Sequence, residues 1–205
     1  MRSPVRVKVC GITNLDDALA ALEMGADALG FNCYRLSPRF ITPAIAAKIV
    51  ARLPRTICTV GVFVNASRQE IEAIVAQVGF TALQFHGDED PSFCLSWSQK
   101  IIKAIRVRGA DAAAEALRYP VDFILADAYV EEHFGGTGRR IALGYLDGFE
   151  QRRLILAGGL TPDNVAEAVR TVGPFGVDVA SGIEQAPGKK DWTLMRRFIA
   201  HAHRA

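Results

Sequence analysis

Short apolar stretches rich in β-branched residues recur along the whole chain and predict its organisation. Their starts are separated by 19 to 31 residues, about the length of one strand, one helix and two short loops. We therefore predict eight strands that alternate with helices. The eight stretches are Val5–Cys10, Ala28–Asn32, Ile57–Val64, Ala82–His86, Ile101–Val107, Phe123–Asp127, Leu154–Ala157 and Gly176–Val179.

Between several of these stretches the apolar residues switch to the spacing of an amphipathic helix. The pattern i, i+3, i+4, i+7 occurs three times, beginning at Leu15, Ile71 and Val165. Two further segments, Pro91–Gln99 and Ala142–Phe149, show weaker periodicity, and we predict helices there mainly because the alternation requires them.

The strand stretches are continuously apolar rather than alternating, which is typical of parallel strands buried on both faces. Eight strand–helix units in about 200 residues fit either a closed barrel or an open doubly wound sheet. The open sheet would be favoured by a GxGxxG motif after the first strand, but Cys10-Gly11-Ile12-Thr13-Asn14 stands there. We therefore predict an α/β fold, a (β/α)₈ TIM barrel, with residues 1–205 forming one domain with short loops.

The composition narrows the class of protein further. Half of the 205 residues are hydrophobic and 22% are charged, which excludes disorder as the main state. The net charge of +2 is spread along the chain, so neither a nucleic-acid surface nor a polybasic membrane anchor is expected. The longest uncharged stretch, Ala73–Gly87, is too short and polar to span a bilayer, and no secretory signal is apparent. We expect a cytoplasmic protein.

The four cysteines, Cys10, Cys33, Cys58 and Cys94, are far apart and form no CxxC pair. A zinc ribbon or thioredoxin-type site is therefore disfavoured, and in the cytoplasm we expect free thiols. His201 and His203 alone do not make a metal site, and we expect them to be solvated in a frayed terminal helix.

Polar side chains gather where the predicted strands end. In a barrel these ends share one rim, and that rim carries the chemistry. Each residue alone has a structural interpretation, such as a buried thiol, a loop cap or a turn glycine, but their convergence indicates a site. The residues are Cys10, Arg39, His86, Asp127, the loop Gly135–Gly138, Gly158-Gly159, Asp178 and Ser181-Gly182.

Two glycine-bearing loops indicate a phosphate site. Gly158-Gly159 follows the seventh strand and Ser181-Gly182 follows the eighth. In this fold, those loops and the N-terminus of a short helix bind phosphate through backbone N–H groups. Glycine lets the backbone approach the anion because it has no Cβ.

Eight groups of residues, spread over nearly the whole chain, follow one another in the order of a known family: Lys8–Thr13, Gly30-Phe31 with Ser37–Arg39, Val60–Phe63, Leu83–Gly87, Gly135–Gly138, Leu156–Leu160 with Pro162 and Asn164-Val165, Gly176–Val179, and Ser181–Glu184 with Pro187-Gly188 and Lys190-Asp191. In these motifs the sequence resembles the phosphoribosylanthranilate isomerase family of tryptophan biosynthesis. It departs from the family pattern at Ile141-Ala142-Leu143, where an aromatic pair is common, and at Ala180, where serine is common.

The resemblance implies an Amadori rearrangement of N-(5-phosphoribosyl)anthranilate to 1-(2-carboxyphenylamino)-1-deoxyribulose 5-phosphate. It implies Cys10 as general base, Asp127 as general acid, and Arg39 as the group that binds the anthranilate carboxylate. An acid with a raised pKa can protonate the ring oxygen, and a thiolate can remove the C2′ proton. Cys10 then needs a depressed pKa or a proton shuttle. We expect orienting or hydroxyl-binding roles for His86 and Asp178.

No metal or organic cofactor is expected, because the imine formed within the substrate is its own electron sink. The expected partner is the small phosphosugar substrate, without nucleic acid or membrane, and the chain is expected to be a monomer or a homodimer. Two alternatives remain: a related isomerase of histidine biosynthesis, which would have a carboxylate in place of Cys10, and a non-catalytic phosphosugar-binding barrel.

Overall fold

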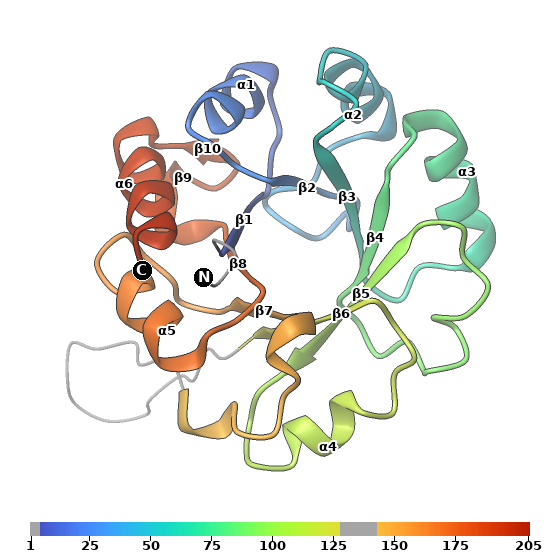
Figure 1. The fold of residues 1–205 in the computed structure, drawn as a ribbon. Coiled ribbons are helices and arrows are strands. Elements are labelled where there is room, and N and C mark those ends of the chain that lie inside the picture. Colours follow the sequence, from blue (N-terminus) through green and yellow to red (C-terminus); the bar gives the residue numbers. More distant parts are fainter. Residues whose placement is uncertain (1–4, 128–142) are drawn as a thin grey trace.

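The computed structural model describes residues 5–127 and 143–205, and its eight parallel strands close into a barrel (Figure 1). Each strand pairs with the next, and β1 pairs with β8 to close the ring. The predicted barrel is confirmed, and four of the predicted strand ranges match the observed bounds. The strands are β1 (Arg6–Cys10), β2 (Ala28–Asn32), β3 (Cys58–Phe63), β4 (Ala82–Phe85), β5 (Lys100–Arg106), β6 (Phe123–Asp127), β7 (Leu154–Ala157) and β8 (Gly176–Val179).

Helices surround this ring of strands (Figure 1). The three predicted from strong periodicity are present, and α3 shows why its sequence folds locally. The Ser67 hydroxyl accepts a hydrogen bond from the backbone N–H of Glu70, and Gly79 ends the helix with a φ of 78°. The helices are α1 (Leu15–Glu23), α2 (Pro43–Val50), α3 (Arg68–Val78), α4 (Ala112–Ala116), α5 (Val165–Val172) and α6 (Trp192–His203).

Shorter elements complete the described part of the chain. Three 3₁₀ turns are η1 (Leu143–Tyr145), η2 (Gln151–Arg153) and η3 (Ser181–Ile183). A small antiparallel hairpin, β9 (Glu184–Ala186) with β10 (Lys189–Lys190), follows η3 and was not predicted. The hairpin lies between α1 and α6 (Figure 1), and Lys190 of β10 donates a hydrogen bond to the carbonyl oxygen of Cys10 at the end of β1.

The strands bury both faces, as their continuous apolar sequence predicts. On β1, Val7 and Val9 belong to the large core between the strands and the helices. Cys10 belongs to a second, smaller cluster inside the barrel, together with Val60 and Leu125. Because side chains alternate along a strand, Lys8 faces the barrel interior with Cys10. This alternation decides which polar groups reach the site.

The helix predicted for Pro91–Gln99 is wrong. The segment is a series of turns, with Ser96 at a φ of 62°. Arg68 explains why. Its guanidinium donates to the carbonyl oxygens of Phe93 and Leu95, at 3.2 and 2.9 Å. In a helix these oxygens would instead accept hydrogen bonds from backbone N–H groups of the helix itself. The same guanidinium lies 4.1 Å from the centre of the Trp97 ring. A distant side chain therefore overrides the local pattern.

The helix predicted for Ala142–Phe149 is also wrong. Ala142 lies outside the described residues, and from Leu143 onward only the three-residue turn η1 forms. Gly148 adopts a φ of 92°, which a right-handed helix cannot contain, and Gly144 adds a second residue that favours non-helical backbone.

The expectation of a frayed C-terminal helix with two solvated histidines is wrong for the helix and for His201, whereas His203 is exposed as predicted. Helix α6 runs to His203, and the Nδ1 atom of His201 lies 2.6 Å from the carbonyl oxygen of Pro162. This contact joins α6 to the loop that precedes α5. All four cysteines are free, as predicted, and Cys10, Cys33 and Cys94 are buried. Within the described residues, no helix has both the length and the apolar character needed to cross a membrane.

Candidate active site

A cavity of about 410 Å³ lies at the carboxyl ends of the barrel strands. It brings together every site residue predicted from the sequence: Cys10, Arg39, His86, Asp127, Gly158, Gly159, Asp178, Ser181 and Gly182. The predicted loop Gly135–Gly138 lies outside the described residues. A larger cavity of about 590 Å³ lies at the opposite end of the barrel, but it is lined mainly by apolar side chains and by strand-start residues such as Arg6 and Cys58.

The thiol of Cys10 lies at the end of β1, beside Gly30 of β2, its partner in the sheet register. A Cβ atom built on Gly30 would lie 2.7 Å from the Cys10 Sγ and 3.1 Å from the Lys8 Nζ. Gly30 therefore leaves the space in which the thiol and the ammonium sit. Burial raises the pKa of Cys10, against the opposing effects of Lys8 and Lys190. The depressed pKa that was one of the two expectations is not found.

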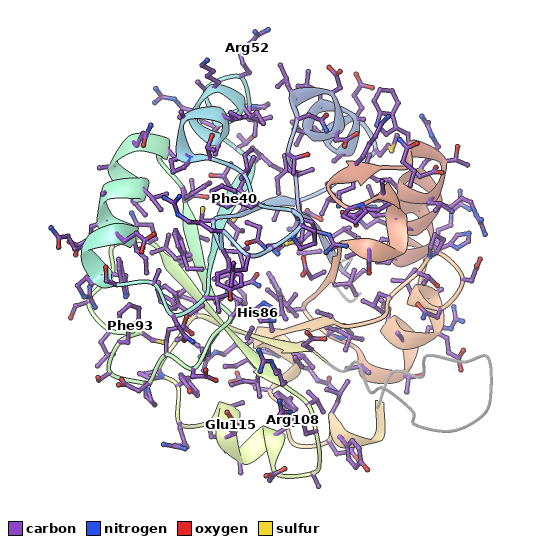
Figure 2. The ribbon with its side chains drawn as sticks, turned by 180° about the vertical axis from the view of Figure 1, so that it is seen from behind. Phe40, Arg52, His86, Phe93, Arg108 and Glu115 are labelled. Carbon is purple, nitrogen blue, oxygen red and sulfur yellow. The ribbon has the colours of Figure 1, made fainter. Side chains whose placement is uncertain are left out.

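Asp127 and His86 form a pair across the cavity. The Oδ2 atom of Asp127, at the end of β6, lies 3.6 Å from the Nε2 atom of His86, which follows β4. The Gln84 side-chain nitrogen lies 3.0 Å from the His86 Nδ1. With Nδ1 in contact with this amide, Nε2 is the ring nitrogen that faces Asp127. Figure 2 shows His86 near the middle of the barrel, with Arg52 and Glu115 at its periphery.

Two buried oxygens at this site, Oε1 of Gln84 and Oδ1 of Asp127, have no hydrogen-bond partner among the described residues. Both residues line the cavity. Buried acceptors are normally paired, so these two atoms are suited to receive hydrogen bonds from a polar ligand.

The loops after β7 and β8 form another part of the cavity wall. Gly158 and Gly159 have φ values of 88° and 65°, a conformation that side chains other than glycine rarely adopt. Asn164 holds this loop, because its side-chain nitrogen donates to the Gly159 carbonyl oxygen at 3.0 Å. A Cβ atom on Gly182 would overlap the carbonyl oxygen of Leu160, so the two loops touch directly. Both loops line the cavity, at the place where this fold commonly binds phosphate through backbone N–H groups.

We expect Gly182→Ala to weaken phosphate binding, because the added methyl group forces the two loops apart. The affinity for inorganic phosphate should fall by roughly tenfold, as measured by calorimetric titration. Gly144→Ala is the matched control, since a Cβ atom there would lie within 4 Å of no other atom of the described residues. An alanine at 182 that leaves the phosphate affinity at the level of the control would contradict this arrangement of the loops.

Comparison with known proteins shows the family of this chain. The family model described as N-(5'phosphoribosyl)anthranilate (PRA) isomerase matches residues 7–201. The chain belongs to the phosphoribosylanthranilate isomerase family. It is 46% identical over 198 residues to N-(5'-phosphoribosyl)anthranilate isomerase of Citrifermentans bemidjiense, with 96% of each chain covered. The predicted family and its isomerase activity are confirmed.

Solved structures of the family have the same fold. Phosphoribosylanthranilate isomerase from Thermotoga maritima superimposes with a TM-score of 0.88 at 42% identity, covering 98% of this chain and 100% of that one. A second structure holds reduced 1-(o-carboxyphenylamino)-1-deoxyribulose 5-phosphate, and it superimposes with a TM-score of 0.85 at 40% identity over the same shares of both chains. A family member thus binds a phosphosugar with an attached carboxyphenyl group.

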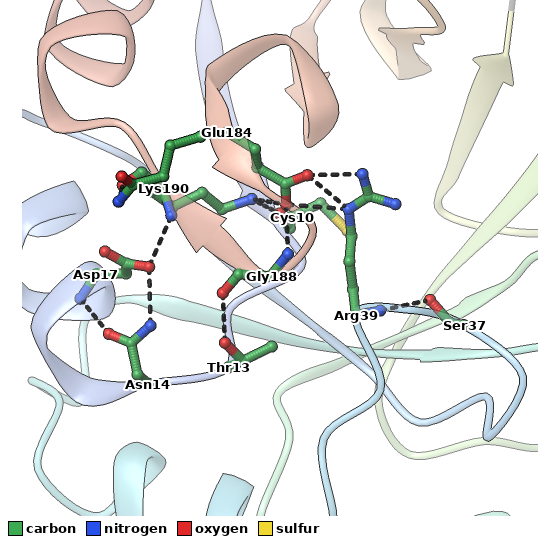
Figure 3. Close-up of polar contacts among 10 residues, drawn as sticks. Cys10, Thr13, Asn14, Asp17, Ser37, Arg39, Glu184, Gly188 and Lys190 are labelled. Carbon is green, nitrogen blue, oxygen red and sulfur yellow. Dashed lines mark hydrogen bonds and ion pairs between the residues drawn. The ribbon is translucent and has the colours of Figure 1, made fainter.

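An ion-pair network connects Arg39 to the hairpin of this isomerase (Figure 3). The Arg39 guanidinium donates to both carboxylate oxygens of Glu184, through Nε at 3.0 Å and Nη2 at 2.6 Å. Lys190 lies 2.9 Å from the same carboxylate and donates to the Cys10 carbonyl oxygen at 2.6 Å. Arg39 and Lys190 hold the pKa of Glu184 below its usual range despite burial. Arg39 is therefore fixed at the cavity wall rather than solvated.

The sequence reasoning missed the roles of four residues in this isomerase site: Lys8, Gln84, Glu184 and Lys190. Lys8 and Gln84 each stand within an apolar strand stretch, at a position that faces the barrel interior with a site residue two positions later. That signal was available, because a charged or amide side chain in such a position needs a partner. Glu184 and Lys190 stand on the unpredicted hairpin, so nothing local indicated that they meet.

Proposed function

We propose that this chain catalyses the Amadori rearrangement of N-(5-phosphoribosyl)anthranilate in tryptophan biosynthesis, with Asp127 as general acid and Cys10 as general base. The observation that carries the proposal is the common cavity: a thiol, a carboxylic acid, an arginine and two phosphate-type loops line one space of about 410 Å³. The substrate carries a phosphate at one end and a carboxylate at the other, which matches the two kinds of donor at the wall.

The two ends of the substrate are recognised by different groups. The backbone N–H groups of the loops at Gly158-Gly159 and Ser181-Gly182 bind the phosphate. Arg39 binds the anthranilate carboxylate. Because its Nε edge is occupied by Glu184, it uses the outer edge formed by Nη1 and Nη2. Asp178 and His86 orient the sugar hydroxyl groups.

The reaction then needs two proton transfers on opposite sides of the sugar. Asp127 donates its proton to the ring oxygen, the bond between that oxygen and C1′ breaks, and the nitrogen lone pair forms a protonated imine. The Cys10 thiolate removes the C2′ proton, and the electron pair moves into the imine to give an enolamine. Return of a proton to C1′ and loss of the O2′ proton give the aminoketose. His86, whose Nε2 lies 3.6 Å from the Asp127 Oδ2, stabilises that carboxylate after its proton has left.

The direct test follows the fluorescence of phosphoribosylanthranilate after addition of the purified protein. We expect the signal to decay with multiple turnovers, and a protein that leaves it unchanged at micromolar concentration is not this isomerase.

One solved isomerase of the family, from Thermotoga maritima, is dimeric. We therefore propose a monomer or a homodimer for this chain, and a cytoplasmic location where the pathway's substrates are available.

Arg39→Ala should separate the two ends of the substrate. Loss of the charge-assisted contact should raise KM for phosphoribosylanthranilate by roughly 10- to 100-fold, with a smaller effect on the Kd for inorganic phosphate. Steady-state kinetics and phosphate titration measure the two quantities. Arg52→Ala, at an exposed position, is the control. A parallel loss of phosphate affinity would place Arg39 at the phosphate end instead.

A further inference from the structure

Lys8 is a buried cation inside the barrel, with 4% of its surface exposed. Its ammonium donates to the Asp178 carboxylate at 2.8 Å, from β1 to the directly opposite residue of β8. Burying an ion pair costs desolvation energy, and an apolar pair of similar volume would often stabilise the fold as well. The pair therefore needs an explanation beyond packing.

The explanation lies in the neighbour of Lys8. Lys8 and Cys10 are two residues apart on one strand, so both side chains enter the barrel interior on the same side. The Lys8 Nζ and the Cys10 Sγ both lie against Gly30, within about 3 Å of the point where its Cβ would be. The charge and hydrogen bonding of Lys8 act to lower the pKa of Cys10, and the Asp178 charge acts to raise it.

The other charged groups around the thiol are already committed to partners. Lys190, from β10, and Arg39, from the loop after β2, both hold the Glu184 carboxylate. The Lys190 ammonium also donates to the Cys10 backbone carbonyl rather than to the thiol. Lys8 also has an acidic partner, Asp178, but its Nζ lies next to the Cys10 Sγ. Among these cations, Lys8 is the one placed to pair with a thiolate.

We propose that Lys8 is a positioning residue for the base: its ammonium pairs with the Cys10 thiolate, and Asp178 holds that ammonium in place. This inference rests on the proposed function, in which the Cys10 thiolate accepts the C2′ proton. When that proton reaches sulfur, Lys8 remains an ammonium and keeps its ion pair with Asp178. Within this pair, the charge of Lys8 therefore acts to lower the pKa of Cys10, and the charge of Asp178 acts to raise it.

The test measures the pH dependence of Cys10 alkylation by iodoacetamide in a protein whose other three cysteines are replaced by alanine. Lys8→Met should move the alkylation midpoint to higher pH by about one unit or more, because the thiolate loses its cation. Asp178→Asn should move it to lower pH, because the cation is no longer neutralised. Lys103→Met is the matched control, since Lys103 is equally buried and paired with Glu89 at 2.9 Å.

The outcomes separate this inference from the proposed function. If Lys8→Met leaves the midpoint where the control leaves it, the pairing is wrong. If Lys8→Met does not fold, Asp178→Asn still decides, because a shift to higher pH or no shift contradicts the proposal. One limb of the pH dependence of kcat/KM should move together with the alkylation midpoint. Should the midpoint move in the variants while both limbs stay fixed, the Lys8–Cys10 pair stands and Cys10 is not the base.

Discussion

Asp127→Asn should lower kcat by on the order of 10²- to 10⁴-fold with little change in KM. The amide keeps the shape of the side chain but has no acidic proton, so ring opening fails while the phosphate and carboxylate contacts remain. The reaction needs the acid in its protonated form and the base in its deprotonated form. These opposite requirements produce a bell-shaped pH dependence of kcat/KM. The variant's residual activity should have lost one of the two limbs. Steady-state kinetics across pH measures both effects.

Two controls make this result specific to the acid step. Asp122→Asn changes an aspartate at the opposite end of the same strand, where it pairs with Lys100, and should leave kcat unchanged. An acyclic substrate analogue bypasses ring opening, so Asp127→Asn should process it nearly as well as the parent does. Near-normal turnover of the natural substrate by the Asn variant would transfer the acid role to His86 or Asp178, which line the same cavity.

The barrel could be predicted from sequence because strand burial depends on a local pattern. Ala28–Asn32 and Phe123–Asp127 match the observed strands, since a short apolar run buried on both faces leaves few alternatives. The segment Pro91–Gln99 could not be predicted in this way. Its conformation depends on Arg68, more than twenty residues earlier, which binds its carbonyl oxygens and stacks on Trp97. Local periodicity contains no information about such a contact.

The positions of the site residues could be predicted from the sequence, but their surroundings could not. Strand ends share one rim in a barrel, so the sequence alone places Cys10 and Asp127 together. The environment that sets their chemistry could not. The bidentate contact between Arg39 and Glu184 spans 145 residues, and the contact between Lys8 and Asp178 spans 170. The pKa of Cys10 is raised rather than depressed because burial outweighs the effects of Lys8 and Lys190, and burial is a property of the folded barrel.

Cys10→Ala should lower kcat by on the order of 10²-fold or more, because removal of the C2′ proton loses its base. Ring opening and binding are untouched, so KM should change little. Because burial raises the pKa of the thiol, the thiolate is the minor form near neutral pH. The parent enzyme's kcat/KM should therefore rise with pH on its acid side. In Cys10→Ala that rise should be absent, as pH-dependent steady-state kinetics will show.

The remaining cysteines supply the control, because they are thiols of the same barrel outside the cavity. Burial raises the pKa of Cys33 to about 12 and that of Cys94 to about 11, so neither is a thiolate near neutral pH. Cys58 lies at the start of β3, at the opposite end of the barrel from the site. Replacing these three with alanine should keep kcat within roughly tenfold of the parent. If the triple variant loses as much activity as Cys10→Ala, with both proteins folded, the loss does not come from a single base at Cys10.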